Sequence, residues 1–189
     1  MNVHMKLAAL AVAACTLFAA PVVAQDDSAH VAGVTAYVKS KVVPWLSDPV
    51  VVQAVLASNK AHAKLMQSDI DQLDNDWKAK DQKLRDSTMK NPLAEFLVKK
   101  KEASGGVITE AFVMDDRGLN VGQTDGTSDM WQADEAKWQK SYGVGPDTIF
   151  VDKVEEEDGK KIAQASVTIS DKGKAIGAIT LGVDVGKLK

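Results

Sequence analysis

The chain is poor in the residues that build disulfides, metal centres and membrane spans. Its 189 residues include one cysteine, Cys15, and three histidines, while aromatic side chains make up 5% of the whole. A disulfide needs two cysteines, and a zinc site draws on three or four Cys, His or acidic ligands. After the first 24 residues, no apolar stretch reaches the roughly 18 to 20 residues of a spanning helix. These absences argue against a disulfide-stabilised fold and against a nitrogen- or sulfur-ligated metal site.

The N-terminus has the three-part pattern of a secretory signal peptide. Met1 to Lys6 form a basic start, Leu7 to Ala20 an uncharged apolar run, and Pro21 to Ala24 a small-residue cleavage pattern. Residues 1–24 are therefore predicted to be removed before Gln25, and the mature protein is predicted to be periplasmic.

A lipoprotein interpretation of the same segment stays open as the weaker alternative. Val12-Ala13-Ala14-Cys15 resembles a lipoprotein cleavage box, which would anchor the product to a membrane through acylated Cys15. The apolar run continues beyond the cysteine to Val23, which favours ordinary cleavage.

Net charge and chain length limit the possible binding partners and the number of domains. Loss of Lys6 with the leader takes the net charge from −3 to −4, so nucleic acid is not expected as a partner. The Lys99 to Lys101 cluster is interpreted as the cationic end of a helix. About 165 residues remain after cleavage, enough for one domain with a sizeable core.

The mature chain divides into a helical region, residues 25–104, and a strand-rich region, residues 105–189, which together are expected to form one structural domain. The composition changes at Ser104-Gly105-Gly106. A first helix is predicted to run to about Trp45, and a shorter one from Leu93 to Lys101.

Between these two helices the spacing predicts one long helix. Its apolar seam steps by three or four residues through Val52, Val55, Asn59, His62, Met66, Ile70, Leu73 and Trp77. Asn59 and His62 are polar members of this seam. They are interpreted as fixing the register between packed helices, with contact to a ligand or a partner chain as the alternative.

After Gly106 the period indicates strands. Val107–Met114 and Leu119–Gln123 are predicted to form a hairpin around Asp115-Asp116-Arg117-Gly118. A helix is expected from Trp131 to Lys140. Three further strands, Thr148–Glu156, Lys161–Ser170 and Lys174–Asp184, are separated by tight turns and predict an antiparallel meander. The fold class is therefore α+β, with long N-terminal helices on a five-stranded antiparallel sheet.

Two blocks, Ala111 to Thr124 and Thr127 to Trp138, resemble exported sensor domains of the Cache family, also called PDC, in a stand-alone single-domain form. The similarity is strongest from Gly106 to Val185. The resemblance implies that the sheet is PAS-like and that a pocket for a small organic molecule such as a carboxylate lies between the curved sheet and the segment that links the second and third strands. Family members commonly convey ligand occupancy to a kinase or chemoreceptor across a membrane, as in two-component systems.

The resemblance places seven residues at this pocket, with apolar or aromatic walls and a few polar groups. They are Phe112, Met114, Asp129, Trp131, Lys137, Trp138 and Tyr142. Trp131 and Trp138 also fit core packing, and Asp129 also fits the cap of a helix that begins at Trp131. No catalytic constellation, cofactor motif or calcium loop is recognisable, so an enzyme is not expected.

Two functions follow as hypotheses. The first is a periplasmic binding module that presents its ligand state to a membrane-bound sensor kinase or chemoreceptor, with dimerisation through the helical seam. The alternative is a ligand-free structural or interaction protein that assembles through the long helix.

Overall fold

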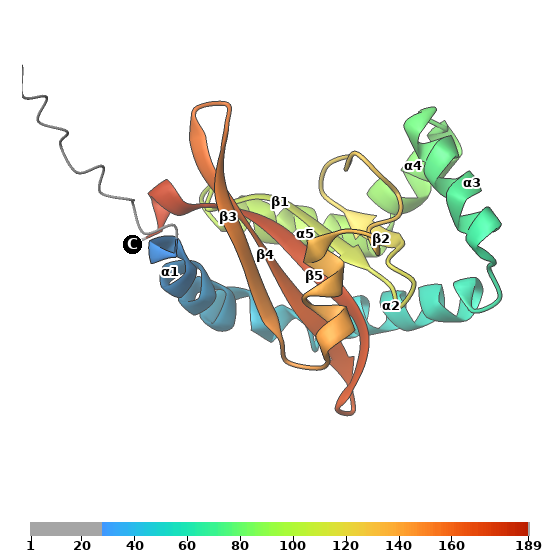
Figure 1. Ribbon diagram of the computed structural model, residues 1–189, viewed down its shortest axis with the longest axis horizontal. Coiled ribbons are helices and arrows are strands. Elements are labelled where there is room, and N and C mark those ends of the chain that lie inside the picture. The colour runs from blue at the N-terminus through green and yellow to red at the C-terminus, as the bar shows by residue number, and fades with distance from the viewer. Residues whose placement is uncertain (1–27, 189) are drawn as a thin grey trace, which may run out of the picture.

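The structure is a computed structural model, and it describes residues 28–188. The predicted signal peptide and Cys15 lie outside these residues. The described part contains helices, three of them short 3-10 helices, and one five-stranded sheet (Figure 1). In chain order the helical region comprises α1 Ala29–Tyr37, the π-helix η1 Val38–Val42, the 3-10 helix η2 Val43–Trp45, α2 Pro49–His62, α3 Gln67–Lys78, α4 Gln82–Met89 and α5 Pro92–Ala103.

The strand-rich region follows after the glycine pair. It comprises β1 Ile108–Met114, β2 Asn120–Gln123, α6 Ala136–Gln139, the 3-10 helix η3 Tyr142–Val144, β3 Ile149–Glu157, β4 Lys160–Asp171, β5 Lys174–Asp184 and the 3-10 helix η4 Val185–Lys187. All strand pairs are antiparallel, in the order β2-β1-β5-β4-β3. The predicted α+β class, hairpin and meander are confirmed.

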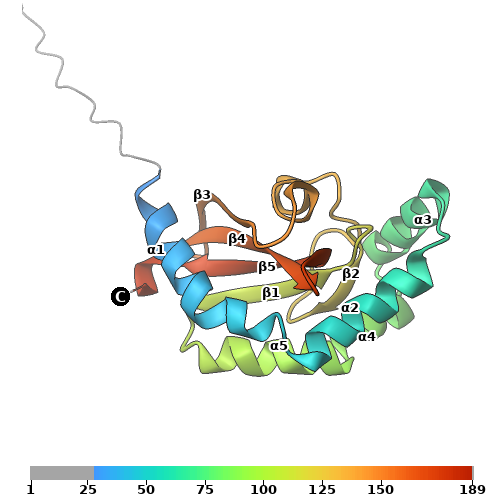
Figure 2. The same cartoon turned by 90° about the horizontal axis from the view of Figure 1, so that it is seen from below.

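The main core lies between the sheet and the helices α1, α2 and α5, which cover one sheet face (Figure 2). Val38, Val55 and Leu97 from the helices meet Leu181 and Val183 of β5, and all five are buried. Both regions of the chain thus contribute to one hydrophobic core. None of the helices formed by residues 28–188 is long and apolar enough to cross a bilayer.

The predicted long helix is wrong, because the chain breaks twice within it. At the first break the Asp69 carboxylate accepts a hydrogen bond from the Met66 amide at 2.8 Å and starts α3. At the second, Lys80 has a φ of 63° and the Asp81 carboxylate accepts from the Leu84 amide at 2.8 Å to start α4. Because these capping aspartates start new helices, the apolar seam does not form one continuous stripe.

Asn59 and His62 do not set a register between helices either. The Asn59 amide donates to the Ile176 carbonyl at 2.8 Å and accepts from the Asp116 amide at 2.9 Å. His62 Nδ1 lies 2.6 Å from Asp115 Oδ2. Both side chains hold the C-terminal half of α2 against the end of the sheet.

Candidate functional site

The open face of the sheet, away from α1, α2 and α5, is covered by the segment between β2 and β3. Figure 2 shows this segment, which carries α6, on the side of the sheet opposite α5. Strand register decides which side chains share the face, because directly opposed residues of antiparallel strands point the same way.

Three rows of opposed residues run across this face. The first joins Glu110, Gly182 and Gln164, the second joins Phe112, Thr180, Ser166 and Phe150, and the third joins Met114, Ala178 and Thr168. The period of two along β1 and β4 thus brings a carboxyl, an amide and hydroxyls beside two large apolar side chains. We call this set and its cover the open-face site.

The polar members of the open-face site are hydrogen-bonded to one another. Gln164 Nε2 donates to Glu110 Oε1 at 3.1 Å, and the hydroxyls of Ser166 and Thr180 lie 2.9 Å apart. Ser166 and Thr180 are both fully buried. Gly182 leaves room for Glu110, since a Cβ there would lie 2.9 Å from Glu110 Cγ.

Burial raises the pKa of the Glu110 carboxyl above its ordinary value, and the hydrogen bond from Gln164 opposes that rise in part. At a given pH, the carboxyl of Glu110 is therefore ionised to a smaller extent than one on the surface.

The cover is built by α6 and η3. The rings of Trp138 and Tyr142 lie 4.8 Å apart and pack on Phe112, Met114 and Ala178. Trp138 Nε1 donates to the Asp115 carbonyl at 3.3 Å, which fixes the indole above the end of β1. Burial and the nearby carboxylates of Asp116 and Asp115 raise the pKa of Tyr142.

Lys137 supplies the cation of the cover. Its ammonium lies 5.5 Å from the centroid of the Phe112 ring and pairs with the Glu135 carboxylate at 2.9 Å. The Lys137 side chain is 14% exposed, against 36% for Glu135. The Lys137 ammonium is largely buried, and its partner carboxylate on Glu135 is more exposed. A bound anion can therefore replace Glu135 as the partner of Lys137.

Five of the seven predicted residues therefore meet at the open-face site, namely Phe112, Met114, Lys137, Trp138 and Tyr142. Asp129 and Trp131 lie apart from them. Trp131 packs beside Ile70, Trp77, Leu119 and Met130, and its Nε1 donates to the Arg117 carbonyl at 2.9 Å.

The helix predicted from Trp131 to Lys140 is too long, since α6 comprises only Ala136–Gln139, and this difference explains why Trp131 lies apart from Trp138. Residues 130–132 pair instead with the β1–β2 hairpin, where the Asn120 amide donates to the Met130 carbonyl at 3.0 Å and the Gln132 amide to the Gly118 carbonyl at 2.8 Å. Asp129 caps no helix at Trp131. Its carboxylate accepts from the Ser128 hydroxyl and pairs with Lys78 at 2.9 Å, and these contacts lower its pKa.

Sequence reasoning did not identify Glu110, Gln164, Ser166 and Thr180 as site residues. The signal was present in part, because Glu110 shares the period of two with Phe112 and Met114 on one strand. Pairing register between distant strands was needed to place the other three. Within residues 28–188, no three His, Asp or Glu side chains gather to hold a metal ion.

Comparison with known proteins gives matches among solved structures only. No family model and no curated protein matches the chain. The sensor domain of the histidine kinase DctB from V. cholerae is 12% identical with a TM-score of 0.45, over 84% of this chain and 52% of that one.

A second match is the ligand-binding domain of the Campylobacter jejuni chemoreceptor Tlp3 in complex with 4-methylisoleucine. It is 11% identical with a TM-score of 0.40, over 82% of this chain and 62% of that one. The present chain thus spans between half and two thirds of the length of these domains. These solved structures are the sensor domain of a histidine kinase and the ligand-binding domain of a chemoreceptor.

Proposed function

We propose that this protein is a periplasmic binding module that takes a small organic molecule at the open-face site. The observation that carries the proposal is the buried polar group beneath α6, where Ser166 and Thr180 face Glu110 and Gln164 next to the ring of Phe112. Because these buried polar groups are paired with one another, their burial costs little free energy, and they offer donors and acceptors with which a bound molecule can exchange hydrogen bonds. Convergent polar groups beside aromatic walls are the usual make-up of a ligand site.

The ligand proposed for this site carries a carboxylate. Lys137 would pair with that group by exchanging Glu135 for it, and the hydroxyls of Ser166 and Thr180 would donate hydrogen bonds to it. Trp138 and Tyr142 would close over the hydrocarbon part of the ligand. Glu110 would then accept from a hydroxyl or ammonium elsewhere on the same molecule.

A membrane-bound sensor kinase or chemoreceptor is proposed as the partner that reads the bound state. Export through residues 1–24 would bring the protein to the compartment where such sensors are exposed. Dimerisation stays a prediction as well. The alternative of assembly through one long helix has lost its motivating feature, since α2, α3 and α4 are separate helices.

A thermal-shift screen tests the proposal. The purified protein is melted with short mono- and dicarboxylates, hydroxy acids and amino acids at constant ionic strength. A ligand at about 100 times its dissociation constant adds about 2.7 kcal/mol of stability, which in a domain of this size is a rise in Tm of roughly 5–10 °C.

Two matched variants locate the bound molecule. Lys137→Gln is expected to remove the shift, whereas Lys160→Gln, at an exposed lysine where β4 begins, is expected to keep it. Thr180→Val, which removes one hydroxyl at nearly constant volume, is expected to reduce it. A panel in which no compound raises Tm, or a shift that survives both Lys137→Gln and Thr180→Val, would refute the proposal.

A further inference from the structure

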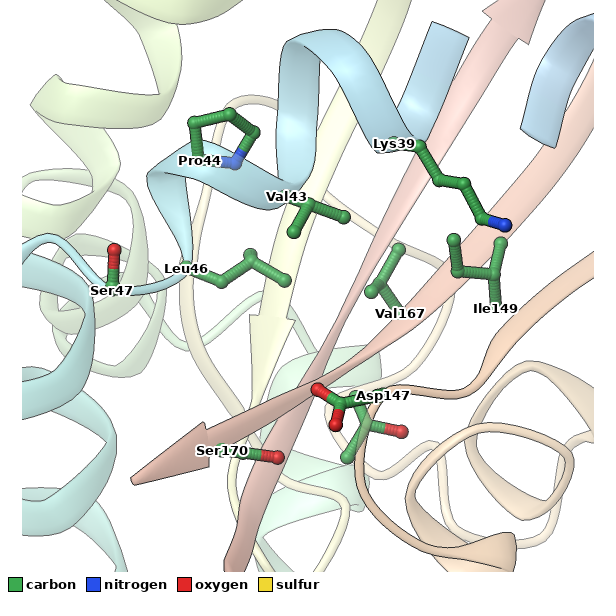
Figure 3. Close-up of a pocket in the computed structure, with 10 residues that line it drawn as sticks. Lys39, Val43, Pro44, Leu46, Ser47, Asp147, Ile149, Val167 and Ser170 are labelled. Atoms are coloured by element: carbon green, nitrogen blue, oxygen red, sulfur yellow. The ribbon is translucent and has the colours of Figure 1, made fainter. Parts of the chain in front are cut away.

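A second cavity lies between the N-terminal helical segment and strands β3 and β4 (Figure 3). It has a volume of about 470 Å³, within the range of roughly 300 to 1,000 Å³ of small-molecule sites. Its walls come from η1, η2 and the residues after them on one side, and from β4 and the start of β3 on the other. It shares only Thr168 with the rows that define the open-face site.

The walls of this cavity are aliphatic. Val43 and Leu46 approach from the helical side, and Ile149 and Val167 from the sheet. Val43 is 39% exposed, so part of its side chain has no protein neighbour where it borders the cavity. A hydrocarbon chain placed here would remove that apolar surface from water.

One buried polar atom at the cavity lacks a partner. Ser170 Oγ is withdrawn from solvent and has no hydrogen bond within residues 28–188. Buried hydroxyls in native proteins are nearly always satisfied, so an orphan that borders a cavity indicates a group missing from it. In Figure 3 the Ser170 hydroxyl is turned toward the Asp147 side of the cavity.

Opposite charges flank the aliphatic walls. Lys39 on η1 and Asp147 before β3 form no ion pair with each other or with any other group in the described part of the chain. Figure 3 shows the side chains of Val167 and Ile149 between the Lys39 ammonium and the Asp147 carboxylate. Asp147 also has a φ of 61°, a strained conformation for a residue with a side chain.

We propose that this cavity binds a small aliphatic molecule with a carboxylate at one end and an ammonium at the other, an ω-amino acid. The carboxylate pairs with Lys39, the ammonium donates to Asp147 and to Ser170 Oγ, and the methylene chain lies between Val43 and Val167. Because the site is separate from the open-face site, this inference goes beyond the proposed function and does not depend on it.

A molecule bound in this cavity would contact both the N-terminal helical segment and the sheet. The walls on the helical side fall where α1 changes to the π-helix η1 and then to the 3-10 helix η2, at Pro44, which has no amide proton to donate. A ligand here contacts the irregular end of that helix and the β3–β4 pair together. It is therefore placed to change the stability of their junction.

The test is calorimetric titration of the protein expressed from the full sequence, with 6-aminohexanoate, hexanoate and hexylamine at fixed ionic strength. 6-Aminohexanoate is expected to bind about three- to fivefold more tightly than either singly charged analogue, since each analogue loses one ion pair with an exposed side chain. Equal affinity for hexanoate or hexylamine, or no heat with 6-aminohexanoate, would overturn the proposal.

Variants locate the bound molecule. Lys39→Gln and Asp147→Asn are each expected to weaken 6-aminohexanoate binding about three- to fivefold, and Asn tolerates the same backbone conformation as Asp. The matched controls Lys41→Gln, two residues along η1, and Asp158→Asn, at a φ of 49° in the β3–β4 turn, are expected to bind as the wild type does.

The same titrations separate this inference from the proposed function. Lys137→Gln is expected to leave 6-aminohexanoate binding unchanged, even where it removes binding of a carboxylate at the open-face site. If Lys137→Gln abolishes 6-aminohexanoate binding while Lys39→Gln does not, the molecule occupies the open-face site and the proposal for the second cavity is wrong.

Discussion

Buried polar side chains at the end of the sheet hold the β1–β2 hairpin in place. Asp115 is fully buried, and its Oδ1 accepts from the amides of Arg117 and Leu119 at 2.9 and 3.0 Å. Its Oδ2 accepts from the Ser58 hydroxyl at 2.9 Å and lies 2.6 Å from His62 Nδ1. One carboxylate thus closes the turn and also ties it to α2.

Glu110→Gln tests the electrostatics of the open-face site. Burial raises the folded-state pKa above the ordinary 4.5, so the unfolded chain releases this proton first as pH rises. Stability is therefore lost as the pH rises from about 4.5 through the raised pKa. Glu110→Gln removes that loss, and its stability relative to wild type is expected to increase from pH 4 to pH 7 in urea denaturation.

The exposed Glu156→Gln serves as the control for that series and is expected to follow the wild-type curve. If the stability of Glu110→Gln relative to wild type is constant, or falls with rising pH, the pKa of the Glu110 carboxyl is not raised by burial.

Gly118→Ala tests the hairpin turn itself. Gly118 has a φ of 76°, and a Cβ there would lie 2.6 Å from Ala133 Cβ and 2.7 Å from the Ala133 amide nitrogen. Gly105 has a φ of 64° and nothing within 4 Å of the added atom. Gly105→Ala is expected to cost about 1 kcal/mol from backbone strain alone, and Gly118→Ala about 2–4 kcal/mol. Equal losses in chemical denaturation would show that the contact with Ala133 relaxes freely.

At the scale of elements, capping side chains determine where the helices begin more than the spacing of apolar residues does. Asp48, Asp81 and Asn91 accept hydrogen bonds from the first turns of α2, α4 and α5. Asn91 also donates to the Val121 carbonyl of β2 at 2.7 Å and to the Ser87 carbonyl at 2.8 Å. It therefore joins three elements, whereas Asp81 acts on its own helix.

Asn91→Ala is accordingly expected to cost about 2–3 kcal/mol, against about 1 kcal/mol for Asp81→Ala. The difference reflects the Val121 carbonyl, which loses its partner in a part-buried position. Urea denaturation of the two variants measures both values. If Asn91→Ala costs no more than Asp81→Ala, the bond from α5 to β2 contributes nothing to stability.

At the scale of the whole molecule, α3 and α4 form an arm that supports the segment between β2 and β3. Trp77 of α3 is fully buried, and its Nε1 donates to the Thr127 carbonyl at 2.8 Å. Arg85 of α4 lies over the indole, 4.7 Å from its centroid. Asp74 accepts from the Met130 amide at 2.9 Å. The arm thus fixes the chain that leads to α6 and the cover of the open-face site.

Trp77→Phe is expected to destabilise the protein by about 2–3 kcal/mol, because it removes the hydrogen bond to Thr127 and leaves a cavity. Hydrogen exchange is expected to accelerate in residues 124–130 and much less in β4 and β5, since α3 does not pack on those strands. Trp45→Phe, at a part-exposed indole, is the control. Uniform acceleration across the sheet would contradict a local role for the arm.

The elements of this fold were largely predictable from local pattern, and the site was predictable in part. Period two and the Asp115 to Gly118 turn predicted the hairpin, and the tight turns predicted the meander. Phe112 and Met114 were placed correctly on the open face because their strand was. The breaks at Met66 and Lys80 were missed, because the apolar spacing of the seam continued across the capping residues.

The sequence alone determined the order of helices and strands and the single class of fold, because apolar period and turn residues act over a few positions. Tertiary structure decided which polar groups meet. Thr180 and Ser166 become neighbours through strand register, Trp131 leaves the site because residues 130–132 pair with the hairpin, and Lys39 faces Asp147 across a cavity that no local pattern foretells. The physical reason is that pairing and packing join residues far apart in the chain, and their energies depend on the complete fold.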